Sequence, residues 1–111
     1  MMFEQGELVE VSFDPTFGHE PQKRRPAVVI SVGYFNNVLS SLQVVCPITS
    51  IVNGHPLHVE IAEGNVVQGC ICLEALRAVD LEARGAKSLG GFLDDKTMTR
   101  VLDGIGGIFG I

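Results

Sequence analysis

Long apolar runs are missing from this 111-residue sequence, since none approaches the roughly 20 residues that a membrane-spanning helix needs. A positively charged leader is missing too, because the first ten residues, MMFEQGELVE, contain acidic side chains and no basic ones. Cysteine is scarce and odd in number, at three residues, which fits reduced thiols better than a disulfide framework. These absences predict a cytoplasmic protein with no membrane segment.

Basic residues are also few, with 8 Lys and Arg against 13 Asp and Glu and a formal net charge of −5. This balance argues against a protein that coats nucleic acid through bulk electrostatics. The basic residues are unevenly placed, however. Lys23–Arg25 is a continuous triplet and a second group lies within residues 77–87. The charge distribution therefore fits a small site for a short polyanion and not a long duplex groove.

Several motifs of enzyme chemistry are absent, including the phosphate-binding GxxxxGK[ST] loop and the GxSxG nucleophile turn. His55, His58, Cys70 and Cys72 offer four potential zinc ligands, but their spacing differs from the usual structural clamps. The two cysteines resemble small apolar residues on a covered strand face, and no histidine or cation is placed beside a particular thiol. We therefore predict no metal site, no cofactor and no cysteine nucleophile.

What the sequence does contain is a single domain over residues 1–111, with 46% hydrophobic residues available for a core. Apolar alternation and short apolar runs bounded by turn residues predict five strands, over residues 8–13, 26–32, 42–49, 57–61 and 66–73. Pro47 is expected to bend the third strand or to leave it at an edge. A helical turn is expected over residues 80–84, closed by Gly85. Five strands with short connections indicate a compact barrel.

A helix is predicted at the end of the chain, capped by Asp94 or Asp95. Its apolar residues recur at spacings of three and four, namely Met98, Val101, Leu102, Ile105, Ile108 and Phe109. Gly104, Gly106 and Gly107 each weaken this helix by about 1 kcal/mol relative to alanine, which leaves fraying and close packing both open. The predicted fold is mainly β with a C-terminal α-helix that packs on the barrel.

The segment DPTFGHEPQKRRPAVVI, residues 14–30, places a polar loop directly before a buried strand. Because this strand is nearly all apolar, it is predicted to be central and covered on both faces. Pro26 fixes its own φ and favours an extended conformation for Arg25, which predicts a guanidinium at the rim of the sheet. Thr49 and Ser50 offer hydroxyls just past the end of another strand. Most exposed charges and turn hydroxyls carry no chemistry, so these features alone do not establish a site.

Five segments together resemble the PemK/MazF family of toxin endoribonucleases, in order and spacing: GELVEVSFDPTFGHE, RPAVVIS, PITS, HVEI and LRAVDLEARGAK. The resemblance runs from about Gly6 to the terminal helix. It implies an SH3-like barrel of the PemK/MazF/CcdB type, a homodimer, and metal-independent cleavage of single-stranded RNA at short preferred sequences. The implied partner is a cognate antitoxin that occupies the RNA surface. A largely apolar small barrel also has a physical motive to pair with a second copy.

The resemblance assigns catalysis to Arg25 and Thr49, and it implicates Glu20 with neighbouring His19. RNA supplies its own nucleophile, the 2′-hydroxyl, so the protein needs a base, a proton donor for the departing 5′-oxygen and cations for the phosphorane. Arg25 suits charge stabilisation and is the candidate proton donor, and Thr49 suits a hydroxyl hydrogen bond. Glu20 is the candidate base, with His19 as its substitute. The predicted RNA-binding residues are Phe17, His19, Gln22, Lys23, Arg24, Ser50, Glu74 and Arg77.

Two departures from the family pattern stand near Glu74. Relatives often follow this acid with glutamine, where the chain has Ala75, and the PemK branch has an arginine two residues before it, where the chain has Cys72. These departures predict one of three outcomes: a slower enzyme, a differently specific enzyme, or one in which Lys23 and Arg24 compensate for the missing contacts. Two alternatives are a CcdB-like gyrase poison, which the absence of a terminal tryptophan disfavours, and a catalytically weakened module that only binds an antitoxin.

Overall fold

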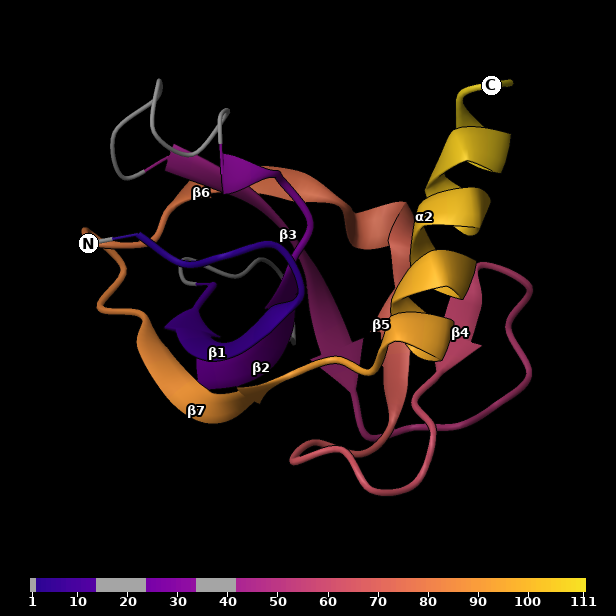
Figure 1. Cartoon of the computed structure of the whole chain (residues 1–111), viewed down its shortest axis with the longest axis horizontal. Coiled ribbons are helices and arrows are strands. Elements are labelled where there is room, and N and C mark those ends of the chain that lie inside the picture. Colours follow the sequence, from indigo (N-terminus) through magenta and orange to yellow (C-terminus); the bar gives the residue numbers. More distant parts are fainter. Residues whose placement is uncertain (1, 14–23, 34–41) are drawn as a thin grey trace, which may run out of the picture.

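The structure is a computed structural model that describes residues 2–13, 24–33 and 42–111. Its seven strands are β1 (Glu7–Ser12), β2 (Arg24–Val29), β3 (Leu42–Thr49), β4 (His58–Glu60), β5 (Cys70–Cys72), β6 (Arg77–Asp80) and β7 (Lys87–Phe92). All pairings are antiparallel, in the order β4-β5-β3-β2-β1-β7, with β6 beside β3. The strands curve around one end of the molecule, and the helix α2 (Asp95–Ile108) lies beside β4 and β5 (Figure 1). By its described hydrogen bonds the sheet is open, and the predicted β architecture with a terminal helix is confirmed.

Two strands were missed by the sequence prediction. β6 reads RAVD and β7 reads KSLGGF, and most of their side chains are exposed or half-buried. Their pairing comes from the backbone of β3 and β1, so their own side chains carry little strand signal. The expected helical turn is a tight connection between them, closed by Gly85 at a φ of 63°. The predicted strand over residues 66–73 shortens to Cys70–Cys72.

Two apolar cores lie on opposite faces of the sheet. Leu8 and Val28 belong to the first, while Val9 and Ala27, their neighbours in the chain, belong to the second. This arrangement explains why β2 reads as a continuous apolar run and not as an alternation. The prediction that β2 is covered on both faces is confirmed, because Ala27, Val28 and Val29 are all fully buried.

Pro47 marks the point where β3 changes partner. Residues 42–45 of β3 pair with β6, and Ile48 and Thr49 pair with β5. On the opposite side Pro47 faces Ala27 of β2. β3 is therefore an interior strand, so an edge position is wrong for it. Proline fits at this step because it has no N–H to donate, and no described strand pairs with Pro47 on the side of β5 and β6.

The helix α2 begins where the sequence predicts, since the Asp94 carboxylate accepts a hydrogen bond from the Thr97 amide at 3.0 Å. Hydrogen bonds from the Thr97 and Asn65 side chains, together with this bond from the Thr97 amide, lower the pKa of Asp94 to about 2. A Cβ on Gly104 would overlap the buried Leu73 side chain, so this glycine permits close packing of the helix. Apolar residues near the end of α2 stay open to solvent, with Ile108 44% and Phe109 64% exposed. Among the described residues no helix has the length and hydrophobicity of a membrane span.

Candidate active site

Strand register brings Arg25 and Thr49 to the same face of the sheet. Ala27 of β2 pairs with Pro47 of β3, and antiparallel partners project to the same side. Because side chains alternate along a strand, Arg25 and Thr49 project to that side as well. This face carries the second core, which includes Ala27 and Val29. The candidate site therefore begins where the core ends, at the ends of two adjacent strands.

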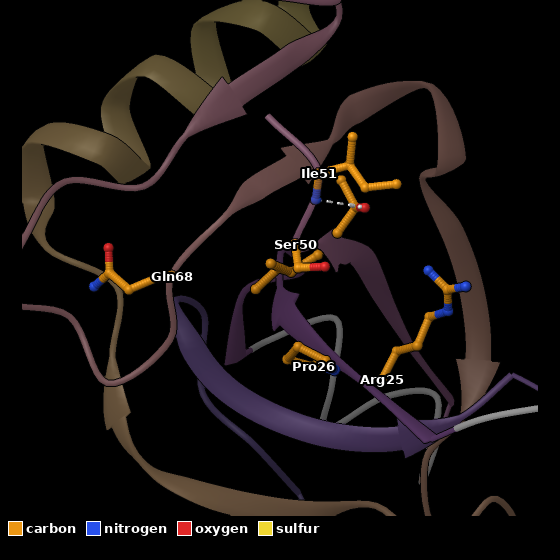
Figure 2. Close-up of a pocket in the computed structure, with 7 residues that line it drawn as sticks. Arg25, Pro26, Ser50, Ile51 and Gln68 are labelled. Carbon is orange, nitrogen blue, oxygen red and sulfur yellow. Dashed lines mark hydrogen bonds between the residues drawn. The ribbon is translucent and has the colours of Figure 1, made fainter. Parts of the chain in front are cut away.

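Arg25 and Thr49 line one pocket of about 330 Å³. Its other lining residues are Pro26, Ile48, Ser50, Ile51 and Gln68 (Figure 2). No carboxylate among the described residues forms an ion pair with the Arg25 guanidinium. The Thr49 Oγ1 atom accepts a hydrogen bond from the Ile51 amide at 3.2 Å, so the Thr49 hydroxyl hydrogen can be donated to a ligand. The pocket can thus present a planar cation and a hydroxyl donor to a phosphate.

Arg24 has a different environment from Arg25 although the two are adjacent. Its Nε atom donates to the Glu10 carboxylate at 2.9 Å. Its Nη2 atom donates to the Glu10 carbonyl at 3.0 Å and to the Gly85 carbonyl at 2.6 Å. These bonds tie the start of β2 to β1 and to the turn before β7. The geometry favours a structural role for Arg24 over the predicted contact with RNA.

An Arg24→Ala substitution tests these two roles. Loss of the partly exposed hydrogen bonds should lower the free energy of unfolding by about 1 kcal/mol, measured by urea denaturation. The salt dependence of RNA binding should stay as in the wild type, because a structural arginine releases no counterion from RNA. A flatter salt dependence in the variant would instead establish a phosphate contact.

Glu74 and two histidines form a polar cluster beside the pocket. Glu74 lies in the short helix η1 (Leu73–Ala75), and its Oε2 atom is 2.9 Å from the Nε2 atom of His58. The His55 and His58 rings stack, with centroids 4.4 Å apart and an interplanar angle of 21°. Burial opposes the charge of Glu74, but the hydrogen bond from His58 and the two nearby imidazoles lower its pKa below the ordinary value. The cluster therefore presents an oriented carboxylate next to an exposed imidazole.

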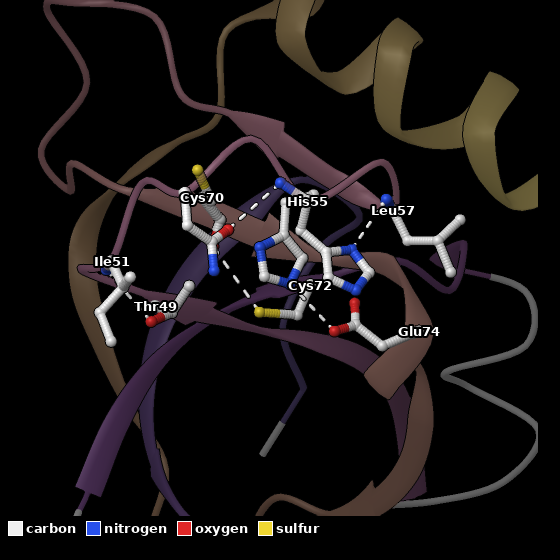
Figure 3. A network of polar contacts seen from close by, with 9 residues as sticks. Thr49, Ile51, His55, Leu57, Cys70, Cys72 and Glu74 are labelled. Atoms are coloured by element: carbon white, nitrogen blue, oxygen red, sulfur yellow. Dashed lines mark hydrogen bonds and ion pairs between the residues drawn. The ribbon is translucent and has the colours of Figure 1, made fainter.

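Cys72 connects this cluster to the pocket (Figure 3). It pairs with His58 in register, so both side chains lie on the site face. Burial, then the charge of Glu74, raises the pKa of the Cys72 thiol, while the Thr49 backbone and Arg25 act in the opposite direction. Groups of both the cluster and the pocket therefore influence the pKa of this thiol. Burial also raises the pKa of Cys70, and that of Cys46 to about 12, so none of these thiols suits a nucleophilic role.

Arg77 and Ser50 are two further predicted RNA contacts, of which Ser50 lines the pocket and Arg77 does not. Arg77 pairs with Val45 of β3, which places it on the same face as Arg25, and its guanidinium carbon lies 5.6 Å from the centroid of the Phe13 ring. Ser50 is exposed and lines the pocket. Gln68 was missed by the sequence analysis, because nothing in its neighbourhood distinguishes it from an ordinary loop residue. The predicted site residues Phe17, His19, Glu20, Gln22 and Lys23 lie outside the described residues.

A second hollow, mainly apolar and about 290 Å³ in volume, opens beside the end of α2. Its lining residues are Leu57, Leu73, Glu74, Leu76, Ile108 and Phe109. Glu74 therefore belongs both to the wall of this hollow and to the cluster with the two histidines. The apolar residues of α2 that the core does not cover contribute the opposite wall.

Comparison with solved structures matches the whole chain to toxins of known fold. The crystal structure of MazF from Deinococcus radiodurans aligns with a TM-score of 0.87 and 31% identity, over 100% of this chain and 99% of that chain. A MazE-MazF complex from the same organism aligns with a TM-score of 0.83 and 27% identity, over 100% of this chain and 98% of that chain. These likenesses confirm the predicted fold type.

Comparison of sequences agrees. The endoribonuclease toxin ChpB of Escherichia coli strain K12 is 42% identical over 101 residues, which cover 84% of this chain and 83% of ChpB. The endoribonuclease PemK of Escherichia coli is 37% identical over 91 residues, which cover 78% of this chain and 67% of PemK. The family model described as "PemK-like, MazF-like toxin of type II toxin-antitoxin system" matches residues 4–109. The chain therefore belongs to the PemK/MazF family of toxins.

Proposed function

We propose that this protein is a toxin endoribonuclease that cleaves single-stranded RNA at short preferred sequences without a metal ion. The observation that carries the proposal is the pocket in which Arg25 and Thr49 stand together. Its support from relatives is direct, since ChpB, PemK and MazF are all named as endoribonucleases. The same relatives favour RNA cleavage over the CcdB-like poisoning of gyrase.

The proposed reaction uses the RNA as its own nucleophile. The ribose 2′-oxygen attacks the adjacent phosphorus while a base takes its proton. The bond from phosphorus to the 5′-oxygen breaks as that oxygen gains a proton, for which Arg25 is the proposed donor. The products are a 2′,3′-cyclic phosphate and a 5′-hydroxyl. Arg25 would hold two phosphate oxygens of the charged transition state, and Thr49 would donate its hydroxyl to one of them. Glu20 is the proposed base, with His19 as the substitute.

The surrounding residues have proposed roles in holding the substrate. Ser50 lines the pocket and Arg77 lies on the same face of the sheet as Arg25, so their hydroxyl and cation suit phosphate contacts. Cys72 lies between Glu74 and the pocket. The Glu74 carboxylate is suited to accept a hydrogen bond from a donor group of a base or from a 2′-hydroxyl. Phe17, Gln22 and Lys23 are proposed RNA contacts on the family resemblance.

A cognate antitoxin is the proposed protein partner. The MazF relatives from Deinococcus radiodurans were crystallised in complexes with MazE at 27% and 26% identity to this chain. We infer that this toxin is likewise neutralised by an antitoxin that covers its RNA surface, that it acts as a homodimer of single-domain chains, and that it works in the cytoplasm, where its RNA substrates are.

A cleavage assay in the presence of EDTA tests this function. The purified protein should cut a defined single-stranded RNA, and mapping of the products should find 2′,3′-cyclic phosphate and 5′-hydroxyl ends. Strict dependence on an added divalent ion would contradict the mechanism. Absence of cleavage together with stabilised gyrase–DNA breaks would support the poison, and absence of both would support the antitoxin-binding remnant.

A further inference from the structure

We propose that His55, His58 and Glu74 form a binding site for a divalent transition-metal ion of the zinc class, beside the RNA pocket. One potential ligand atom from each of these residues lies within 4.8 Å of the others, and no other such group of three occurs in the described part of the chain. Two imidazoles and one carboxylate are a donor set that zinc accepts, with a fourth position for water. The ion would be additional to the proposed cleavage reaction, which does not use it.

The orientation of the side chains favours convergence on one ion. The Nδ1 atom of His55 faces the Leu57 amide at 3.0 Å, which leaves Nε2 as the outward atom. His58 directs its Nε2 atom at the Glu74 carboxylate. The stacked rings hold the two imidazoles close together, and one ring nitrogen of each lies within 4.8 Å of a Glu74 carboxylate oxygen. Tetrahedral zinc with bonds of about 2.0–2.1 Å needs ligand atoms about 3.3 Å apart. The His58–Glu74 pair would therefore open from 2.9 Å, and ligand atoms that lie up to 4.8 Å apart would move closer when the ion binds.

The backbone holds the three residues close before any ion binds. His58 begins β4, and the His58 amide donates to the His55 carbonyl at 3.0 Å, which closes the turn between them. The His55 amide donates to the Asn53 side chain at 3.2 Å. Glu74 follows β5, the strand that pairs with β4. The site is thus assembled by two paired strands and one braced turn.

Binding through the Nε2 atoms has a cost that limits the affinity. A neutral imidazole that binds a metal through Nε2 carries its proton on Nδ1. In His55 that proton would displace the Leu57 amide, and in His58 it would lie on a buried atom with no hydrogen-bond partner among the described residues. Metal-binding histidines usually donate this proton to an acceptor. We therefore expect an exchangeable ion and not a structural one.

The zinc ligands proposed from the structure differ from the four potential ligands considered in the sequence. The two histidines appeared there with Cys70 and Cys72, whereas the structure groups them with Glu74 and leaves both cysteines out. The effect on activity rests on the proposed function: an ion on Glu74 would occupy a predicted RNA contact next to the Arg25 pocket. Zinc should therefore inhibit RNA cleavage.

Calorimetric titration of the full chain with zinc chloride, after removal of metals with EDTA and dialysis, tests the site without RNA. The wild type should bind one ion per chain. His55→Gln and Glu74→Gln should each weaken binding by at least the roughly 10- to 100-fold seen when a ligand's supporting contact is lost. Both side chains are exposed, so these variants should fold. Glu60→Gln, which removes an exposed carboxylate from β4, is the matched control and should bind as the wild type does.

Cobalt substitution identifies the ligands. The Co²⁺ form should lack a thiolate charge-transfer band, and Cys72→Ser should bind zinc as the wild type does. Unchanged affinity in both His55→Gln and Glu74→Gln, or a thiolate band that Cys72→Ser abolishes, would overturn the proposal. In His55→Gln, the ratio of the RNA cleavage rate without zinc to the rate with zinc should fall to near one. If the protein cleaves RNA in EDTA but binds no zinc, only the proposed metal site is contradicted. If it binds zinc but does not cleave RNA, only the proposed nuclease function is contradicted.

Discussion

Arg25→Ala should reduce RNA cleavage by at least about 10²- to 10³-fold, the usual loss when one well-aimed donor to a developing anion is removed. Arg25 lines the pocket with Thr49, and no described carboxylate holds its guanidinium. Its place in β2 depends on backbone pairing with Val11, which alanine preserves. The variant should therefore lose activity and toxicity while it keeps the fold, as measured by initial cleavage rates and by circular dichroism.

Two further variants show whether the effect belongs to this guanidinium. Arg25→Lys keeps the charge but loses the planar pair of donors, so its rate should lie between those of the wild type and Arg25→Ala. Arg100→Ala removes an exposed arginine from α2 and should cleave RNA at the wild-type rate. Full activity in a correctly folded Arg25→Ala protein would remove Arg25 from the mechanism.

Gly69→Ala should destabilise the protein by about 3 kcal/mol and also impair cleavage. Gly69 has a φ of 122°, which disfavours a side chain. A Cβ here would overlap the Thr49 carbonyl oxygen and lie 3.3 Å from the Ser50 Cα. Backbone strain and overpacking each cost about 1–3 kcal/mol. The clash would also displace the end of β3, where Thr49 and Ser50 enter the pocket.

Gly64→Ala is the matched control for this substitution. Gly64 also has a positive φ, 95°, but no atom of the described residues lies within 4 Å of its hypothetical Cβ. This variant should lose only about 1 kcal/mol from backbone strain and should retain the wild-type rate of cleavage. Urea denaturation and initial rates measure both variants. If Gly69→Ala lost no more stability than Gly64→Ala, the tight contact between Gly69 and the Thr49 backbone would be refuted.

The sequence predicted what depends on local chemistry. The apolar run after Pro26 predicted a strand buried on both faces, and Asp94 predicted the start of the helix, because proline geometry and helix capping act within a few residues. It did not predict β6 and β7. Their hydrogen bonds come from partners far away in the chain, and their own residues have little preference for strands.

The fold also gives different environments to adjacent residues of the same type, which the sequence alone does not distinguish. Arg24 and Arg25 look equivalent within a basic triplet, yet alternation along β2 sends one to Glu10 and the Gly85 carbonyl and the other to the pocket. Similarly, His58 and Glu74 are 16 residues apart in the chain. Their contact depends on the register between β4 and β5, which local sequence patterns do not specify.

The apolar hollow at the end of α2 has one charged side chain, Glu74, in its wall. A wholly aliphatic molecule seated there would strip water from that carboxylate and return no hydrogen bond, a loss that its own desolvation would have to outweigh. A molecule that carries an ammonium, amide or hydroxyl group beside its apolar part would avoid this loss. The hollow therefore selects amphiphilic occupants over purely hydrophobic ones.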